Sequence, residues 1–185
     1  SNEDQLNTDA IFAAQQNPLV IGDDLGDVCD PNDDNDALTD EEEDLNEDGV
    51  YNPGVESNPK DPDTDGDAHI DGNDNCILDS NPNQQNTDQE LVDGGETLIQ
   101  GDPKGDECDD DDDNDGLLDT FELGTSNTDP FNPDHDDDEV IDSQDNCPLV
   151  SNADQTNTDQ FLNANGAPIP ADDEGNACDG DDDND

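Results

Sequence analysis

The stretch DHDDDEVIDSQDNC, residues 134–147, carries aspartates at positions 1, 3, 5, 9 and 12 and ends in Asn146-Cys147. Residues 63–76 repeat this spacing and the same Asn-Cys ending, with His69 at position 7. A short backbone loop with acidic residues at this spacing can wrap oxygen ligands around one Ca²⁺ ion. The sequence therefore predicts calcium-binding loops and a fold that depends on the metal. The predicted ligands are Asp134, Asp136, Asp138, Asp142 and Asp145 in one copy, and Asp63, Asp65, Asp67, Asp71 and Asp74 in the other.

Two further loops have the same spacing. Residues 111–122 match an EF-hand loop most closely, because Gly116 stands at position 6 and Glu122 at position 12. Residues 32–43 have Ala37 in place of that glycine. Prolines soon follow both loops, so long flanking helices, and hence EF-hand domains, are not expected. The predicted ligands are Asp111, Asp113, Asp115, Asp119 and Glu122 in the first, and Asn32, Asp34, Asp36, Asp40 and Glu43 in the second.

Composition explains why a metal is needed. The 185 residues include 58 Asp and Glu against 2 Lys and Arg, a formal charge of −56, with 25% hydrophobic and 3% aromatic residues. Such a chain buries too little apolar surface to offset its backbone entropy and, without metal, resembles a disordered acidic segment. Divalent cations would reverse the repulsion between its carboxylates. The lack of basic surface excludes nucleic acid as a partner.

The five cysteines form no CxxC pair, and His69 and His135 stand apart from them, so a zinc site is not expected. Disulfides are the better interpretation, and they indicate an oxidising compartment. No apolar run approaches the length of a membrane span. We expect a piece of a secreted or surface protein whose targeting segments lie outside this sequence.

Self-alignment reveals a repeat of three copies. Each copy reaches a Gly-Asp/Asn-x-Cys-Asp box, at Cys29, Cys108 and Cys178, and then an acidic run. The predicted divisions are 1–36, 37–115 and 116–185. By register, the residue expected to pair with Cys29 lies before Ser1, and the last loop is cut at Asp185, so the array is expected to continue in both directions.

These motifs resemble thrombospondin type 3 repeats, which occur in animal matrix proteins and in many bacterial surface proteins. The resemblance rests on the aspartate loops with their Asn-Cys endings, on Asn-x-x-Gln-x-Asn-x-Asp at 81–88 and 152–159, and on the cysteine boxes. It implies an irregular, metal-stabilised repeat with few helices, in which the chain winds around a row of calcium ions. It also implies disulfides between Cys76 and Cys108 and between Cys147 and Cys178, with Cys29 unpaired in this chain.

The chain departs from the family at two kinds of place. Position 6 is Ala37, Ala68 or Glu139 rather than glycine, so those loops are expected to turn differently or bind more weakly. The second loop type of the family is split by about a dozen residues after each Asn-Thr-Asp, which leaves open whether one ion is shared across each split. Its candidate ligands are Asn7, Asp9, Asp23, Asp27 and Asp30; Asn86, Asp88, Asp102, Asp106 and Asp109; and Asn157, Asp159, Asp172 and Asp179, with Asp181, Asp183 and Asp185 in the final half-loop.

The segments that split these loops carry apolar pairs around turn dipeptides. This pattern predicts short β-hairpins at 89–101 and 160–171, and a third between Ile11 and Ile21. Two roles remain open for them: local packing under the disulfides, or contacts between molecules in a fibre.

A further partial loop begins at Asp44. Asn46, Asp48 and Gly49 follow the calcium spacing, but Val55 stands at position 12. The His69 side chain, at a position where a backbone carbonyl would bind, is expected to be solvated even though the residue belongs to a metal loop.

These features predict a calcium-binding, disulfide-braced rod or spacer in an extracellular or cell-surface protein, one that folds on binding calcium at about 10⁻⁴ to 10⁻³ M. The alternatives are a subunit of a homopolymeric fibre, the stalk of an adhesin or of a secreted hydrolase, and a disordered acidic segment. Partners would be calcium and either further copies of the chain or other surface proteins. No nucleophile with a base is recognisable, so no enzymatic activity is expected.

Overall fold

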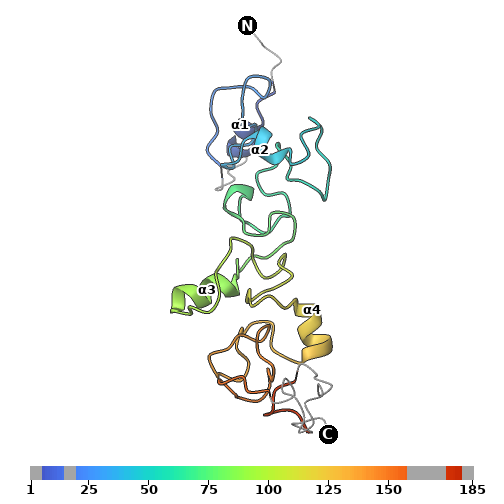
Figure 1. The fold of residues 1–185 in the computed structure, drawn as a ribbon. Coiled ribbons are helices and arrows are strands. Elements are labelled where there is room, and N and C mark those ends of the chain that lie inside the picture. The colour runs from blue at the N-terminus through green and yellow to red at the C-terminus, as the bar shows by residue number, and fades with distance from the viewer. Residues whose placement is uncertain (1–5, 15–19, 158–173, 181–185) are drawn as a thin grey trace. The chain divides into compact units, whose positions relative to one another are not determined.

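The computed structural model describes residues 6–14, 20–157 and 174–180. The chain divides into two compact units, Ser1–Gln85 and Asn86–Asp185 (Figure 1). The second unit begins at Asn86, the first residue of an Asn-Thr-Asp motif. The repeat boundaries predicted above follow sequence register and stay predictions.

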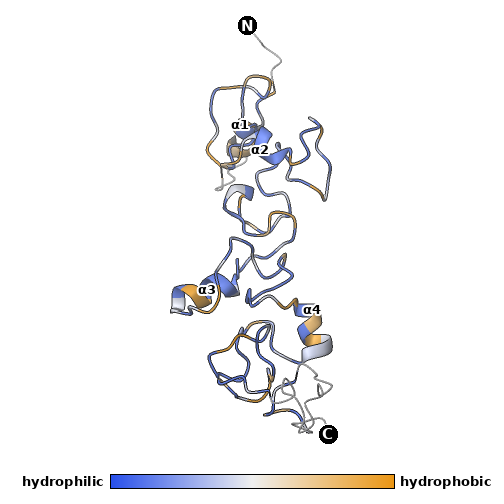
Figure 2. Ribbon diagram, viewed as in Figure 1, coloured by the Kyte–Doolittle hydropathy of each residue, from blue (hydrophilic) through white to orange (hydrophobic). Residues whose placement is uncertain are grey.

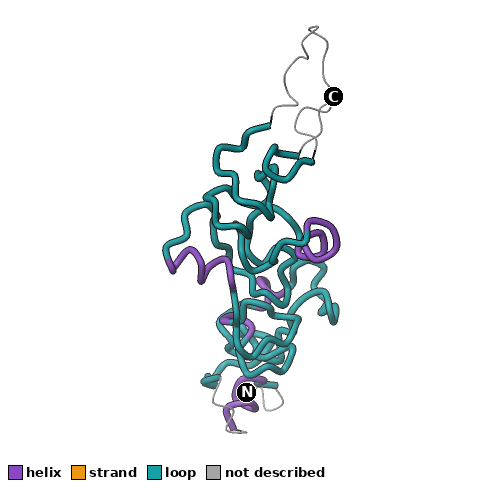
Figure 3. The backbone as a smooth tube through the Cα atoms, turned by 90° about the horizontal axis from the view of Figure 1, so that it is seen from below, coloured by secondary structure: helices purple, strands orange, loops and turns teal. Residues whose placement is uncertain are grey.

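Loops make up most of the described chain, and the helices are short (Figure 3). No β-strand occurs in the described ranges, where pairing of this kind is limited to an isolated parallel bridge between Pro53 and Glu56. The expectation of an irregular fold with few helices is therefore confirmed for these residues. The helices are α1 (Thr8–Ala14), α2 (Asp40–Glu43), the 3-10 turn η1 (Asp71–Asn73), α3 (Thr87–Gly94), α4 (Asp119–Phe121) and the π-helical turn η2 (Glu122–Ser126).

Helix α3 takes the place of the hairpin expected at 89–101, and that prediction was wrong. The Asn86 side chain caps the first turn of the helix. Gly95 ends it in the left-handed conformation, with φ of 112°, and donates its N–H to the carbonyls of Leu91 and Val92. The double glycine that resembled a hairpin turn is thus the C-terminal cap of a helix.

The other two expected hairpins fare differently. Ile11 lies within α1, so the expected hairpin is replaced by a helix as far as Ala14, whereas residues 15–19 lie outside the described residues. Asn7 starts that helix much as Asn86 starts α3, because its side-chain oxygen accepts a hydrogen bond from the Ala10 N–H at 2.7 Å. The remaining hairpin, at 160–171, lies outside the described residues.

Carboxylates, rather than apolar groups, fill the interior of the described chain. Apart from prolines and glycines, its buried apolar residues are Val20, Cys76, Ile99 and Cys147. Hydrophobic residues are otherwise scattered along the backbone (Figure 2). Because enclosed carboxylates lose their hydration, such an interior needs a compensating charge. The acidic side chains that are almost wholly enclosed are Asp9, Asp34, Asp36, Glu43, Glu56, Asp71, Asp88, Asp113 and Glu122.

Disulfides brace the fold. Cys147 and Cys178 are bonded, with Cα atoms 5.6 Å apart, as the resemblance implied. Cys76 and Cys108 are the other disulfide-bonded cysteines, whereas Cys29 is free and exposed. Two disulfides indicate a protein that matures outside the reducing cytoplasm. Within the described ranges, no helix has the length and apolar character needed to cross a membrane.

Candidate cation-binding sites

The four predicted loops, which begin at Asn32, Asp63, Asp111 and Asp134, close by the same two hydrogen bonds. The backbone N–H at position 9 donates to the carbonyl of the residue before position 1, at 2.9 to 3.1 Å. The position 9 carboxylate in turn accepts the backbone N–H at position 2, at 2.8 to 3.1 Å. Position 9 therefore holds the start of each loop against its end. The position 9 residues are Asp40, Asp71, Asp119 and Asp142.

A left-handed residue at position 6 turns each loop. Ala37, Ala68 and Glu139 have φ of 88°, 81° and 75°, close to the 100° of Gly116. The expectation that loops without glycine turn differently was therefore wrong. The hydrogen bonds around the turn favour one conformation over the intrinsic preference of an L-residue for negative φ.

Substitutions at position 6 in opposite directions, alanine to glycine and glycine to alanine, test how much the left-handed conformation costs. We expect Ala68→Gly to raise the free energy of unfolding by up to about 1 kcal/mol, because a left-handed L-residue costs roughly that much more than glycine. Gly116→Ala should lower it by a similar amount, since a Cβ there would sit 3.5 Å from Ser143 Oγ without a clash and only the backbone conformation is penalised. Urea denaturation at fixed cation concentration measures both. If both variants shifted the midpoint in the same direction, the backbone explanation would be wrong.

Positions 1, 3 and 5 bring their carboxylates together. In three loops, one oxygen from each of these residues lies within 4.8 Å of the others. In the loop that begins at Asn32, Asp34 and Asp36 converge with Glu43 of α2 instead. This spacing suits one small cation bound by oxygen atoms. The three-residue groups are Asp63, Asp65 and Asp67; Asp111, Asp113 and Asp115; and Asp134, Asp136 and Asp138.

Position 12 supplies a long, enclosed carboxylate in two loops. Glu43 and Glu122 are 1% and 0% exposed. Thr128 Oγ1 donates to Glu122 Oε1 at 3.0 Å, but Glu122 Oε2 has no donor. Neither Glu43 oxygen has a donor in hydrogen-bonding geometry. Enclosed carboxylate oxygens without donors need a positive charge to offset their lost hydration.

The raised pKa values of these enclosed carboxylates also favour a cation-binding role. Burial, reinforced by the negative charge of Asp36, raises the pKa of Asp34 to about 8. Burial and the charge of Asp34 raise the pKa of Glu43 to about 8. In unit 2, burial raises the pKa of Asp113 to about 8 and that of Glu122 to about 7. A bound cation would favour the ionised form of each group.

Neighbouring loops within a unit meet through position 5. In unit 2, Ser143, just after position 9 of one loop, donates its N–H to Asp115 Oδ2 of the preceding loop at 3.0 Å. In unit 1 the corresponding residue is Gly72. Burial raises the pKa of Asp36, and the backbone N–H of Gly72 is one of the donors that oppose this rise. A Cβ at Gly72 would lie 2.7 Å from the Asp36 carbonyl oxygen, so the contact requires glycine.

The Asn-Cys endings join a side-chain network that repeats in both units. In unit 1, Gln84 accepts the Asn75 N–H and donates to Asp74, at 3.0 and 2.8 Å. Gln155 makes the equivalent bonds to Asn146 and Asp145, at 2.8 and 2.7 Å. The Asn-x-x-Gln motif found in the sequence thus positions the carboxylate at position 12.

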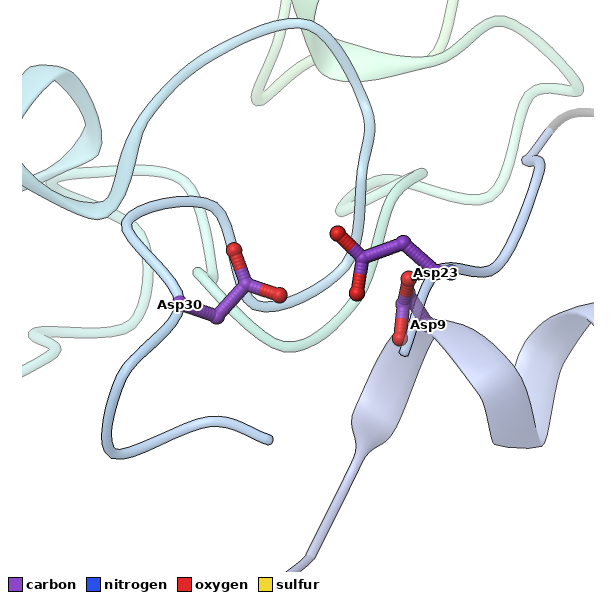
Figure 4. A group of neighbouring side chains, drawn as sticks. All are labelled: Asp9, Asp23 and Asp30. Atoms are coloured by element: carbon purple, nitrogen blue, oxygen red, sulfur yellow. Dashed lines mark hydrogen bonds between the residues drawn. The ribbon is translucent and has the colours of Figure 1, made fainter. Parts of the chain in front are cut away.

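The split loops close across their insertions. Asp9 accepts the Asp23 N–H at 2.6 Å, and Asp88 accepts the Asp102 N–H at 2.8 Å. Asp9, Asp23 and Asp30 bring carboxylate oxygens within 4.8 Å of one another around a common space (Figure 4). The insertion therefore leaves a possible site intact in unit 1.

The remaining candidate ligands of the split loops either bond to other groups of the protein or lie outside the described residues. Asp27 and Asp106 bind the backbone N–H and hydroxyl of Thr8 and Thr87, at 2.7 to 2.9 Å, while Asp109 faces Lys104. In the third copy, the Asn157 side chain donates to the Glu174 carbonyl at 2.8 Å, and the Asp179 N–H donates to the Gly175 carbonyl at 3.0 Å. Five predicted ligands lie outside the described residues: Asp159, Asp172, Asp181, Asp183 and Asp185.

Both histidines donate hydrogen bonds from their backbone N–H groups to aspartate carboxylates. The His69 N–H donates to Asp67 and the His135 N–H to Asp142, at 2.8 and 2.9 Å. The His69 ring Nε2 lies 3.4 Å from the Pro82 carbonyl oxygen. Neither ring belongs to the carboxylate groups described above.

Sequence reasoning missed Glu56. In the partial loop, Asp44 accepts the N–H groups of Asp48 and Gly49, at 3.1 and 2.7 Å, as a position 1 aspartate does. Glu56 is 1% exposed and accepts the Asn46 side chain at 3.2 Å and the Asn52 N–H at 2.6 Å. It stands one residue beyond position 12, so a fixed spacing overlooked it. Gly54, two residues before Glu56, was the available sign of this extra residue, because it adopts a left-handed backbone conformation.

No model of a known protein family matches this chain, and no curated protein matches it either. The resemblance to thrombospondin type 3 repeats therefore rests on the motifs alone and stays a prediction.

Proposed function

We propose that the chain is a calcium-binding structural segment of the thrombospondin type 3 kind, serving as a spacer in an extracellular or cell-surface protein. The observation that carries the proposal is the repeated enclosure of convergent carboxylates that have oxygens without a donor: both oxygens of Asp34 and of Glu43, and Oδ2 of Asp113. Oxygen ligands of this number and charge suit Ca²⁺.

Metal-coupled folding is the proposed mechanism. In the absence of a cation, each loop would have to enclose several negative charges that repel one another. Binding would remove that repulsion and fix the loop, so part of the binding free energy would become folding free energy. Positions 1, 3, 5 and 12 would supply side-chain ligands, while position 9 closes the loop by its two hydrogen bonds.

Calcium titration of the whole chain at pH 7.5 tests the proposal, with circular dichroism and small-angle scattering as readouts. We expect a reversible transition from an expanded to a folded chain at about 0.1 to 1 mM calcium. Glu122→Gln, which keeps the shape but removes the buried charge, should lower the number of bound ions by one.

Glu107→Gln is the matched control, because Glu107 is exposed and lies in the same unit. It removes the same formal charge and should leave the ion count unchanged. A chain that stayed expanded at 10 mM calcium would contradict the proposal. Equal ion counts in the two variants would contradict the assignment of Glu122.

A further inference from the structure

The two lysines are the only Lys or Arg residues of the chain, and one of them acts as an internal counter-ion in unit 1. Lys60 Nζ lies 2.8 Å from Asp27 Oδ2 and also contacts Asp33 Oδ2. Asp27 belongs to the first cysteine box, and Asp33 stands at position 2 of the loop that follows. Both aspartate side chains are buried, so the ammonium group bridges two carboxylates at the edge of the fold.

The two aspartates recur in unit 2 with the same local structure. Asp106 occupies the place of Asp27 and accepts the Thr87 N–H and hydroxyl, as Asp27 accepts those of Thr8. Asp112 occupies the place of Asp33, and its N–H donates to the position 9 carboxylate at 3.1 Å, as that of Asp33 does at 2.9 Å.

The lysine does not recur. Lys60 stands two residues before Pro62, and the matching place before Pro133 is held by Phe131, which has no positive charge. Lys104, the one lysine of unit 2, lies 3.6 Å from Asp109, and the side chain of this lysine is 56% exposed.

Asp112 is consequently an enclosed carboxylate without a counter-ion. It is 7% exposed, and its Oδ1 is buried without a hydrogen-bond donor. Asp106 is among the acidic groups whose charge acts on Asp112, as Asp27 is among those that act on Asp33, the pair that Lys60 bridges in unit 1.

We infer that unit 2 binds an additional metal cation between Asp106 and Asp112, at the place that the Lys60 ammonium fills in unit 1. This site is separate from the neighbouring loop site, because the group that converges there consists of Asp111, Asp113 and Asp115. The hard carboxylate oxygens and their double negative charge favour a divalent ion such as Ca²⁺ over a monovalent one.

Counting bound calcium by equilibrium dialysis tests this inference in two directions. Asp112→Asn should bind one ion fewer than the unchanged chain. Lys60→Gln should bind one ion more, because it frees Asp27 and Asp33 for a cation. The double variant Lys60→Gln with Asp33→Asn should return to the original count, since one of the freed carboxylates is removed again.

Asp110→Asn is the matched control for unit 2. Asp110 is exposed and adjacent in sequence, so its charge would matter only for diffuse attraction of ions. An unchanged count in both Asp112→Asn and Lys60→Gln would overturn the inference, as would an equal loss in Asp112→Asn and Asp110→Asn. A gain in Lys60→Gln supports it even if Asp112→Asn fails to fold. If the unchanged chain bound no calcium, the proposed function would fail together with this site, whereas failure of the site alone leaves the other ions in place.

Discussion

Removing divalent cations at pH 8 is expected to unfold the chain, whereas removing them at pH 5 should leave much of the fold in place. Buried carboxylates cause the difference. Asp34, Glu43 and Asp113 have pKa values of about 8 in the fold, against about 4 in an unfolded chain. Between these values the unfolded chain has released protons that the metal-free fold retains. Its stability therefore falls as pH rises from about 4 to about 8.

The expected loss of stability is large enough to unfold the metal-free chain completely. A group that is ionised only in the unfolded chain lowers the free energy of unfolding by up to about 1.4 kcal/mol per pH unit. Several such groups acting together would exceed the roughly 5 to 15 kcal/mol that usually separates folded from unfolded domains. Circular dichroism of the chelated protein across this pH range measures the effect.

Calcium-saturated protein is the control, and its pH dependence should have the opposite sign. Protons compete with the cation for the same oxygens, so its stability should rise with pH over the range in which the metal-free chain loses it. Equal slopes with and without calcium would contradict the assignment of these carboxylates as cation ligands.

Replacing both Cys147 and Cys178 by serine is expected to lower the free energy of unfolding by about 3 to 4 kcal/mol. The bond joins residues 31 apart in sequence, and the chain-entropy estimate for a loop of this length lies in that range. Cys147 is almost fully buried, and the Asn146 carbonyl accepts the Gly175 N–H at 2.9 Å beside the bond. Urea denaturation in excess calcium measures the change.

Cys29→Ser provides the comparison for the disulfide variant. Cys29 is free and exposed, so its replacement removes a thiol without breaking a bond. Its denaturation midpoint should match that of the unchanged chain. If the double variant shared that midpoint, the disulfide would contribute little to the stability of unit 2.

The calcium-loop spacing predicted much of the local structure. Positions 1, 3 and 5 were found from sequence alone, and their oxygens converge in three of the four loops. Such motifs are readable because their ligands lie close together in the chain and their spacing follows from the short loop itself. The Cys147–Cys178 bond was predicted from the order of cysteines in the thrombospondin type 3 repeats that the chain resembles.

The predictions from sequence that were wrong or incomplete also have physical causes. Helix α3 was mistaken for a hairpin because Gly94-Gly95 can form a turn or end a helix, and the cap at Asn86 decides between them. Ala68 and Glu139 adopt left-handed conformations because surrounding hydrogen bonds override local preference. Glu56 was missed because one extra residue shifts it out of a fixed spacing.

An interior made of carboxylates also changes how the fold should respond to heat. The heat-capacity change of unfolding comes mainly from apolar surface exposed to water, and it is offset by exposed polar surface. The described residues enclose few apolar side chains, so we expect this change per residue to lie below the ~12–15 cal/mol/K of ordinary domains. A small heat-capacity change gives a flat stability curve. We therefore expect the ionic composition of the surroundings, more than their temperature, to govern whether the chain is folded.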